Sequence, residues 1–469
     1  MPQQTSDLMP EALDQADCLT HALINTPSLH RHRFHVPGHA GRRIFAAPGL
    51  SPEACFYDVS EVEGVDVLSE PSGCIANSQA FAANLFAVAR TFFTVGGASV
   101  GIQAAMLCLC SPGKRVLVPR NAHRSVLSGL ILTGAQPVWL MPDWHDAGLF
   151  APLAAAQVQA AFQRDESLAG LVLTSPTYEG WAADVLAIAE MCQRYNRFCI
   201  VDEAHGSLFA LDDAWPDSAC HARGVDAVIH AAHKGLGSLT QTGLLHLPHG
   251  SRVAPEQAQQ ALNTLTSTSP SYLLLASLDA AMQFQASDAG KQARSNLMAH
   301  AKKTRDAIAH YSEMNLLDVP NLDLTKLFVT TPYCGEQWGA WLESERGIGY
   351  EAINAFGVLY AGGLGHTPND WQTLTQALKH LDTCLDSLAS EQCWPQRAKQ
   401  CAFMMPDMAC LPREAFFAPK TRVPAAQAVG RIAAETIVHC PPGIPVLLPG
   451  ERVTELHVPC LPEFVSVVV

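Results

Sequence analysis

An apolar run that ends in a lysine and a glycine-rich turn is the most informative part of this chain. It reads Val225-Asp226-Ala227-Val228-Ile229-His230-Ala231-Ala232-His233-Lys234-Gly235-Leu236-Gly237-Ser238. A second apolar run, Phe198-Cys199-Ile200-Val201, ends in Asp202-Glu203-Ala204-His205-Gly206. Short apolar runs bounded by turn residues are typical of buried strands. Because ligand sites in parallel sheets lie at the carboxyl ends of the strands, we expect Asp202 and Lys234 to share one edge.

Helices and strands alternate around these two runs, from about residue 77 to residue 247. The pattern predicts helices at residues 78–90, 99–110, 124–134, 153–164 and 185–195, and strands at 91–95, 115–118, 137–140, 171–174, 198–201, 227–230 and 244–247. Regular alternation of this kind is typical of an α/β domain whose mainly parallel sheet is covered on both faces.

The chain has 469 residues, which is too long for one compact core. We predict an N-terminal arm at residues 1–55, a major domain at 56–300 and a smaller α+β C-terminal domain at 301–469. A long helix at residues 271–310 would bridge the last two. The C-terminal pattern predicts a strand at 326–330, helices at 371–388 and 424–435, and extended chain with turns at 440–451.

Lys234 and Asp202 together indicate the cofactor pyridoxal 5′-phosphate (PLP). A PLP enzyme links a lysine covalently to the cofactor aldehyde and pairs an aspartate with the pyridine nitrogen, so that the ring accepts electrons. A lone lysine is more often a surface residue in a loop. That alternative explains neither Asp202 nor the segment Gly96-Gly97-Ala98-Ser99-Val100-Gly101, so we predict catalytic roles for Lys234 and Asp202.

The segment at residues 96–101 follows a predicted strand and opens a predicted helix. Small residues let the backbone approach an anion, a helix N-terminus offers free N–H groups, and Ser99 adds a hydroxyl. We therefore predict that Ala98 and Ser99 hold the PLP phosphate, with Ser238 and Thr240 as further donors. The pattern GxGxxG is absent, so the segment is not a dinucleotide fingerprint.

Further candidates follow the strand ends. An aromatic ring at His123 would stack on the pyridine face, although a loop or helix-cap histidine is the alternative for this residue taken alone. His205 and His233 are placed to reach the same ligand, and a hydroxyl at Thr177 would reach the ring oxygen or the substrate. We predict the catalytic residues Lys234, Asp202, His123 and His205, and the cofactor-binding residues Ala98, Ser99, His123, Thr177, Asp202, Ala204, His233 and Lys234.

Composition limits the partners and the compartment. The net charge is −14 and no basic patch appears, which argues against nucleic acid. No apolar run approaches the ~20 residues that cross a membrane, and the polar N-terminus is unlike a signal peptide, so we expect a cytoplasmic protein. The 15 cysteines form no CxxC pair, and the histidines at 30, 32, 35 and 39 lack a matching ligand set, so we expect no metal site.

Ordered motifs run along nearly the whole chain. They are Phe34-His35-Val36-Pro37-Gly38-His39, Asp58-Val59-Ser60-Glu61, Pro71-Ser72-Gly73, Arg120-Asn121-Ala122-His123-Arg124-Ser125, Thr174-Ser175-Pro176-Thr177-Tyr178, Asp202-Glu203-Ala204-His205-Gly206, His233-Lys234, Thr268-Ser269-Pro270-Ser271-Tyr272, Pro412-Arg413-Glu414-Ala415-Phe416-Phe417 and Pro442-Gly443-Ile444-Pro445. On these motifs the chain resembles the Orn/Lys/Arg decarboxylase family, the bacterial basic amino acid decarboxylases.

The resemblance implies a fold-type I PLP-dependent (aspartate aminotransferase-like) three-layer sandwich. It implies loss of CO₂ from lysine, ornithine or arginine, which gives cadaverine, putrescine or agmatine. In that family, the residues that match Lys234, Asp202 and His123 hold PLP, contact its pyridine nitrogen and stack on its ring.

The resemblance also implies an assembly. The region Thr268-Ser269 is expected to reach the partner subunit's site, so we expect a homodimer, or a dimer of dimers, with shared active sites. The chain is similar to the family's short form, which has no N-terminal wing domain.

Four positions depart from the family pattern. Ala231 stands where Ser is usual and lacks a phosphate hydroxyl, Gly96 replaces Asn, Glu179 replaces Tyr, and Ala40 replaces Lys. Two alternatives therefore stay open: a PLP-dependent aminotransferase, and a catalytically reduced regulatory homologue. A cationic substrate side chain needs a carboxylate partner, and the candidates are Glu61, Glu63, Asp66 and Glu179.

Overall fold

The structure is a computed structural model that describes residues 18–29, 32–44, 51–388, 405, 407–439 and 444–469. Parts of the predicted arm (1–17, 30–31 and 45–50) and of the predicted extended segment (440–443) lie outside the described residues.

A seven-stranded sheet forms the centre of the molecule, with the order β1-β9-β8-β7-β6-β2-β3. Its strands β8, β7, β6, β2 and β3 pair in parallel, whereas β9 is antiparallel to both β8 and β1. The mainly parallel sheet predicted from the sequence is therefore confirmed. The strands are β1 (Arg90–Thr94), β2 (Arg115–Pro119), β3 (Gln136–Leu140), β6 (Leu168–Thr174), β7 (Phe198–Asp202), β8 (Ala227–His230) and β9 (Gly243–Leu247).

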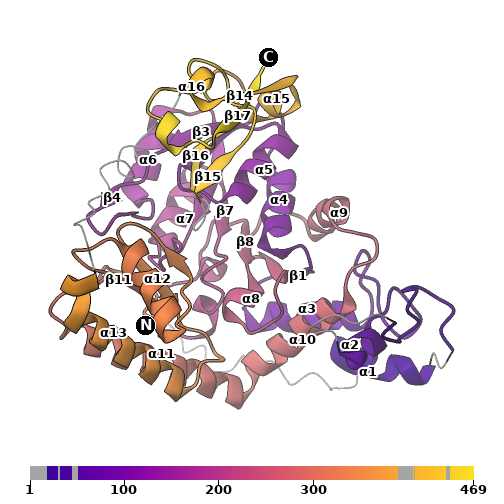
Figure 1. Cartoon of the computed structure of the whole chain (residues 1–469). Coiled ribbons are helices and arrows are strands. Elements are labelled where there is room, and N and C mark those ends of the chain that lie inside the picture. The colour runs from indigo at the N-terminus through magenta and orange to yellow at the C-terminus, as the bar shows by residue number, and fades with distance from the viewer. Residues whose placement is uncertain (1–17, 30–31, 45–50, 389–404, 406, 440–443) are drawn as a thin grey trace.

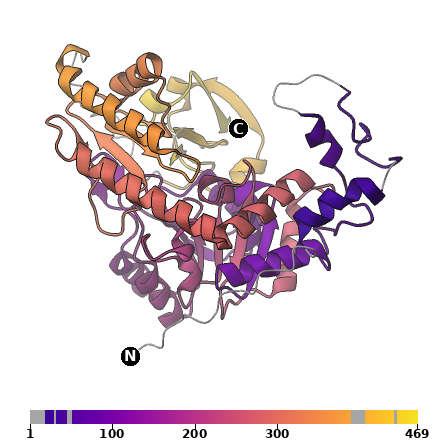
Figure 2. The same ribbon diagram turned by 90° about the horizontal axis from the view of Figure 1, so that it is seen from below.

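Helices cover both faces of this sheet, as Figures 1 and 2 show. One face packs against α4 (Gly97–Leu109), α5 (Arg124–Thr133) and α9 (Pro255–Leu265). The other face packs against α1 (Leu19–Leu29), α3 (Cys74–Leu85), α6 (Ala155–Arg164), α7 (Val185–Arg194) and α10 (Tyr272–Ala286). Every residue of β7, β8 and β9 is buried, which explains why these strands are nearly continuous apolar runs. The three-layer α/β sandwich is confirmed.

A smaller four-stranded sheet, β10-β11-β13-β12, lies beside the major sheet and packs under α12 and α13 (orange in Figure 1). Its elements are β10 (Asn315–Leu316), β11 (Lys326–Thr330), α12 (Gly335–Arg346), β12 (Ala352–Ile353), β13 (Gly357–Ala361) and α13 (Pro368–Leu388). Helix α11 (Asp288–Ile308) packs against α13 and connects this sheet to the major one. Two short elements, β4 (Trp144–His145) and β5 (Leu149–Phe150), form a hairpin between the two regions.

The last 60 or so residues form a separate small body above β3 and α5 (yellow in Figure 1). It has its own apolar core and two strand pairs, β14-β17 and β15-β16. Its elements are α15 (Pro412–Phe417), β14 (Lys420–Pro424), α16 (Ala425–Ala428), β15 (Ile437–His439), β16 (Ile444–Leu447) and β17 (Phe464–Val468). The predicted boundary at residues 300 and 301 falls inside α11, and the division into three domains stays a prediction.

Three predicted helices differ from the structure. The helix at 271–310 is two helices, because Ser287 is extended and its hydroxyl caps α11 by accepting a hydrogen bond from Gly290 N–H. The helix at 424–435 is wrong: only Ala425–Ala428 is helical, and Gly430 adopts a positive φ of 82° that ends it. The helix at 78–90 begins earlier, at Cys74, because Asp66 accepts hydrogen bonds from the backbone N–H groups of the first turn.

Candidate active site

The predicted catalytic residues lie together at the carboxyl edge of the major sheet. Asp202 is the last residue of β7, and Lys234 lies in α8 (Ala232–Gly235), the short helix that follows β8. These two strands are hydrogen-bonded neighbours in the sheet. Lys234 and Asp202 therefore lie at one edge of the sheet, as the two apolar runs predict.

Lys234 contacts His205 and Tyr178. Its Nζ lies 2.6 Å from His205 Nε2 and 5.8 Å from the centre of the Tyr178 ring. The side chain is open to solvent, but the protein atoms around it exclude enough water to lower the pKa of the amine, while Asp202 opposes that shift. A lowered pKa favours the neutral amine, which is the form that attacks an aldehyde.

His205 is held neutral. Burial and the positive charge of Lys234 lower its pKa well below the ordinary value of 6.5. Its Nδ1 is buried and has no hydrogen-bond partner among the described residues. A neutral imidazole in contact with the amine can accept a proton from Lys234 and return one to a ligand.

Asp202 is buried and incompletely paired. Its Oδ1 accepts a hydrogen bond from Ala204 N–H at 3.2 Å, and the side chain is only 4% exposed. Burial raises its pKa to about 6, although the nearby positive charge of Lys234 opposes this. A buried carboxylate that lacks a bonded cation can accept a hydrogen bond from the protonated pyridine nitrogen of PLP, which keeps that nitrogen charged.

His123 lies near Lys234 at the start of α5. Its Nδ1 accepts a hydrogen bond from Ser125 N–H at 3.2 Å and lies 2.8 Å from Ser125 Oγ. Burial and the charges of Lys234 and Arg124 lower its pKa to about 4, so the ring is neutral at pH 7. His123 thus caps α5 and is also a neutral ring near Lys234. That it stacks on the pyridine ring of PLP stays a prediction.

The predicted phosphate cradle has the required shape. Helix α4 begins after Gly96 without a side-chain cap, so its first-turn N–H groups have no side-chain acceptor. Gly97 adopts a positive φ of 71° and donates a hydrogen bond to Gln241 O at 2.8 Å. A Cβ on Gly243 would lie 2.9 Å from Ala98 N, so the glycine there keeps this backbone accessible.

The loop after Lys234 is held by its own hydrogen bonds, and its role in holding a phosphate stays a prediction. His233 Nδ1 lies 3.0 Å from Thr242 O, which orients its ring. Ser238 Oγ lies 2.6 Å from Thr242 Oγ1, and the Thr242 hydroxyl donates to Leu239 O. Ala231 is the N-cap of α8 and provides no side-chain cap, so the hydroxyl usual in the family is missing where a helix begins.

Thr177 lies in a closed turn beside the site. Its Oγ1 accepts a hydrogen bond from Trp181 N–H at 3.3 Å, and its hydroxyl also bonds Glu179. Glu179 is partly exposed at the surface, but the surrounding protein atoms raise the pKa of its carboxyl. The hydroxyl of Thr177 is therefore already hydrogen-bonded within its own turn, and its contact with PLP or substrate stays a prediction.

The acidic candidates proposed for the substrate side chain are not all available. Both oxygens of Asp66 accept backbone N–H groups at the start of α3, which makes it a structural cap. Glu61 accepts a hydrogen bond from Ser60, and Glu63 is exposed. Thr268 and Ser269 are exposed in the loop between α9 and α10. The roles of Glu61, Glu63 and the segment Thr268-Ser269 stay predictions.

Two residues of the smaller sheet enter the site without any signal in the sequence. Glu351 Oε1 accepts a hydrogen bond from Tyr178 Oη at 2.6 Å, and its charge raises the pKa of Lys234. Lys326 in β11 is buried, and its charge lowers the pKa values of Lys234 and His205. Both belong to a separate sheet, so no local motif links them to Lys234.

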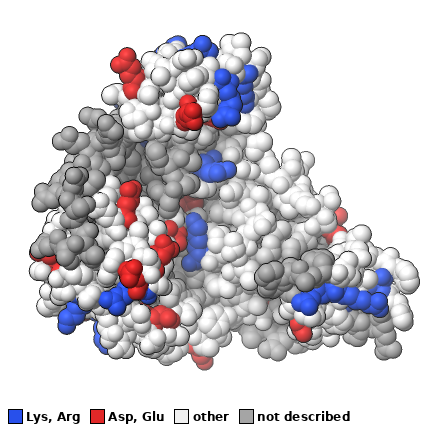
Figure 3. Space-filling view, viewed as in Figure 1, with Lys and Arg blue, Asp and Glu red and all other residues white. Residues whose placement is uncertain are grey.

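The face of the molecule seen in Figure 1 is hollowed near its centre. Figure 3 shows a basic side chain at the base of the hollow and acidic side chains along the side formed by the orange elements of Figure 1. Negative charge along one wall favours a cationic ligand.

The residues fit PLP. The buried carboxylate of Asp202 matches a pyridine nitrogen, the uncapped start of α4 matches a phosphate, and Lys234 has a lowered pKa as an aldehyde-binding amine needs. The partnerless Nδ1 of His205 offers one more polar contact at this edge.

Comparisons with known proteins define the class. The family described as Orn/Lys/Arg decarboxylase, major domain, matches residues 17–346, and its C-terminal domain matches residues 395–465. The chain is similar to the arginine decarboxylase of Bacillus subtilis (strain 168), at 31% identity over 91% of this chain and 89% of that protein. It is similarly related to the arginine decarboxylase of Bacillus anthracis, at 32% identity over 92% of this chain and 90% of that protein.

A solved structure supports the same fold. The lysine decarboxylase LdcF of Francisella novicida superposes with a TM-score of 0.83, at 17% identity, over 97% of this chain and 82% of that one. The fold is that of the fold-type I PLP-dependent enzymes. The chain belongs to the Orn/Lys/Arg decarboxylase family and is an amino acid decarboxylase, a carbon–carbon lyase. Among the described residues, no helix is both long enough and apolar enough to span a bilayer.

Proposed function

We propose that this enzyme decarboxylates arginine to agmatine, with PLP bound to Lys234. The lowered pKa of Lys234 beside the neutral His205 is the observation that carries the PLP assignment. The similarity to two arginine decarboxylases over about nine-tenths of the chain supports arginine before lysine or ornithine. Lysine to cadaverine and ornithine to putrescine are the other two reactions within the class.

The protein's own groups would work as follows. Asp202 holds the cofactor nitrogen protonated, His123 holds the ring flat, and the first turn of α4 at Ala98 and Ser99 holds the phosphate. Bound PLP supplies an electron sink for the pair released as CO₂ leaves. His205 Nε2 would accept a hydrogen bond from the Lys234 amine, and the proton that the substrate ammonium brings would pass through one of these two groups to the substrate α-carbon.

The side chain of the substrate would meet Glu351. Its carboxylate is exposed in the site, already accepts one hydrogen bond from Tyr178, and lies close enough to influence the Lys234 amine. A planar guanidinium pairs well with a carboxylate through two parallel hydrogen bonds. Glu351 is therefore our candidate for reading the guanidinium in this chain, in addition to residues from a partner subunit.

The test is a product screen with purified enzyme, added PLP and each of arginine, lysine and ornithine, with CO₂, amine and keto acid measured in parallel. We expect agmatine and CO₂ in equal amounts and the highest kcat/KM for arginine. Glu351→Gln should raise KM for arginine more than it lowers kcat, whereas Glu345→Gln on the exposed end of α12 should change neither. Keto acid without CO₂ would instead indicate an aminotransferase.

The assembly and the compartment are part of the same proposal. We infer a homodimer, or a dimer of dimers, in the cytoplasm. The arm presents Phe34 at 100% exposure and Val36 at 65% exposure, and exposed apolar side chains of this kind favour a protein–protein contact. The absence of a visible cofactor band after PLP is added would favour the regulatory homologue instead.

A further inference from the structure

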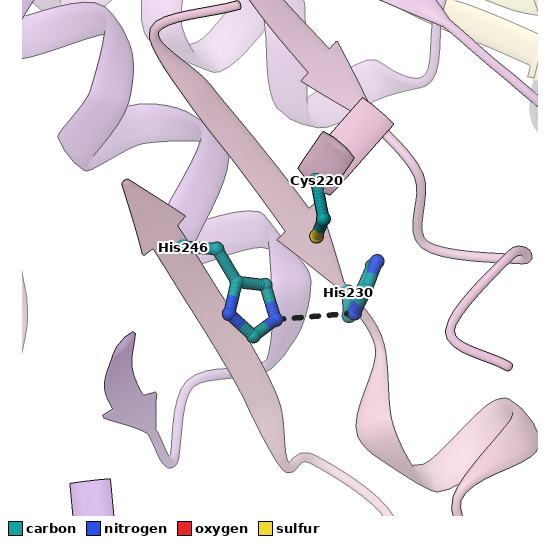
Figure 4. A group of neighbouring side chains, drawn as sticks. All are labelled: Cys220, His230 and His246. Carbon is teal, nitrogen blue, oxygen red and sulfur yellow. Dashed lines mark hydrogen bonds between the residues drawn. The ribbon is translucent and has the colours of Figure 1, made fainter. Parts of the chain in front are cut away.

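Three potential metal ligands meet behind the active site, on the face of the sheet opposite α4. Cys220 lies in the 3-10 turn Ala219–His221, His230 ends β8, and His246 lies in β9. All three are buried, with exposed fractions of 3%, 0% and 0%. Figure 4 shows that the three side chains point toward one another from these separate segments.

The facing atoms are close together. His246 Nε2 lies 3.1 Å from His230 Nδ1, and one ligand atom from each of the three residues lies within 4.8 Å of the others. Two ligand nitrogens bound to one zinc ion at ~2.0 Å are separated by about 3.3 Å in tetrahedral geometry. The observed separation of the two nitrogens is therefore close to the spacing that a shared ion requires.

The outward nitrogen of each imidazole is already oriented. His230 Nε2 lies 2.7 Å from Glu203 Oε2, and His246 Nδ1 lies 2.8 Å from Thr91 Oγ1. Metal-binding histidines usually donate their other N–H to a carboxylate or another oxygen in this way, which leaves the inner nitrogen as a ligand. If both outer nitrogens carry the protons, the two inner nitrogens face each other without a proton between them. A cation would resolve that repulsion.

Glu203 is itself held in place. Its Oε2 accepts a hydrogen bond from Ser218 Oγ at 2.7 Å, and its Oε1 accepts one from Ala219 N–H at 2.8 Å. These contacts tie the carboxylate to the turn that carries Cys220. A Cys220 thiolate and the Glu203 carboxylate would together balance the two charges of a divalent ion, so the buried site would be neutral.

We propose that Cys220, His230 and His246 bind a zinc ion. One thiolate and two imidazoles form a ligand set that zinc prefers over harder cations such as magnesium or calcium. Binding would replace the thiol proton of Cys220, which passes to solvent, with a zinc–sulfur bond.

A surface pocket borders one of the three residues. It has a volume of about 740 Å³, and its lining includes Cys220, His221, Arg223, His249 and Arg252. An ion could enter along this pocket, and a water in it could supply a fourth ligand. The described residues offer three protein ligands here.

The zinc would join the strands that carry the catalytic residues. His230 precedes Lys234 by four positions, and Glu203 directly follows Asp202. An ion bound to β8, β9 and the turn at Cys220 would hold both strand ends from behind. The site is thus a positioning element and not a part of the reaction chemistry, and it does not depend on the proposed substrate.

The first test is metal content. The full-length enzyme with PLP is purified, passed over a chelating resin and analysed by plasma mass spectrometry, with an expected value of one zinc per chain. Cys220→Ser should lose the zinc, whereas Cys110→Ser, which changes another buried thiol of the same domain, should keep it. Glu203→Gln keeps all three ligands and should weaken zinc binding roughly 10- to 100-fold, measured by competition with a chelator.

The second test reports the ligands directly. Wild-type protein loaded with Co²⁺ should show a thiolate-to-cobalt charge-transfer band in the near ultraviolet, which Cys220→Ser abolishes and Cys110→Ser retains. Folded wild-type protein that neither contains zinc nor takes up Zn²⁺ or Co²⁺ on dialysis would overturn the proposal and leave a plain histidine–histidine hydrogen bond. A cobalt band that persists in Cys220→Ser would overturn it as well. Neither readout requires decarboxylase activity, so a failure here is distinct from a failure of the proposed reaction.

Discussion

The guanidinium of Arg120 donates hydrogen bonds to both carboxylate oxygens of Glu451, at 2.6 and 3.0 Å, although 331 positions separate the two residues. Both side chains are buried, at 3% and 0% exposure. Arg120 lies three residues before His123, and Glu451 belongs to the C-terminal body. This ion pair therefore fixes the C-terminal body to the loop that places His123 beside Lys234.

We expect Glu451→Ala to destabilise the protein by about 3–5 kcal/mol, because it leaves the Arg120 charge buried without a partner. Urea unfolding gives the free energy of unfolding. The matched control is Glu190→Ala, which removes one partner of the exposed Arg194–Glu190 pair and should cost less than about 0.5 kcal/mol. Equal effects of the two changes would contradict the anchoring role of Glu451.

Lys234→Ala should abolish both the visible band of lysine-bound PLP and turnover, while the fold is retained. The side chain is exposed and, among the described residues, bonds to His205, so little packing is lost. Removing its charge should also raise the pKa of His123 from about 4 toward 6.5, which NMR titration of the cofactor-free protein can follow. The control is Lys291→Ala, at an exposed position of α11. It should change neither the PLP band, nor turnover, nor the pKa of His123. Repeated turnover by the Lys234 variant would exclude this lysine as the PLP ligand.

The burial of Asp202 predicts a pH dependence for the cofactor-free protein. Its pKa is about 6 in the folded state against 3.8 for an ordinary aspartate, so the folded state binds this proton more tightly than the unfolded state. Stability should therefore fall as pH rises from about 4 to 6, by about 3 kcal/mol in total for this group.

Asp202→Asn removes this ionisation. We expect the variant without cofactor to be more stable than the wild type at pH 7.5 and to lose that advantage at pH 4, as measured by urea unfolding. With PLP the order should reverse, because the wild-type carboxylate then has the pyridine nitrogen as a partner. The same difference between the two proteins at both pH values would show that Asp202 is not the titrating group.

Ala231→Ser should tighten PLP binding. It adds a hydroxyl at the start of α8, where the family has one for the phosphate, and one hydrogen bond is worth about 1 kcal/mol, or roughly fivefold in Kd. Fluorescence titration of the cofactor-free protein with PLP measures the effect. Ala254→Ser adds the same hydroxyl at the uncapped start of α9, away from the site, and should leave the Kd unchanged. An unchanged Kd for Ala231→Ser would place the phosphate out of reach of this position.

Phe34→Glu tests the assembly. A fully exposed phenylalanine in the arm is a candidate contact with a second subunit, and a charge there should disfavour that contact. Analytical ultracentrifugation should show a shift from dimer to monomer, with loss of activity if the active sites are shared. Leu186→Glu, at a 45% exposed position of α7, should leave the sedimentation unchanged.

Much of the site follows from local sequence. The apolar runs at residues 198–201 and 227–230 are strands in the structure, and the glycine-rich segment at 96–101 opens a helix as predicted. The meeting of their carboxyl ends could be anticipated because parallel strands of one sheet end at the same edge. The helix at residues 424–435 was wrong because its residues pair with strands distant in sequence, for instance Ala433 with Val467.

Local sequence is enough to predict the α/β sandwich and the meeting of Lys234 with Asp202, because apolar periodicity and short connections act over tens of residues. The contacts between separate bodies depend on tertiary packing. Glu351 and Lys326 enter the site from the smaller sheet, Glu451 reaches Arg120 from the C-terminal body, and Cys220 meets His230 and His246. These contacts depend on how folded segments pack against one another, and no spacing along the chain encodes that packing.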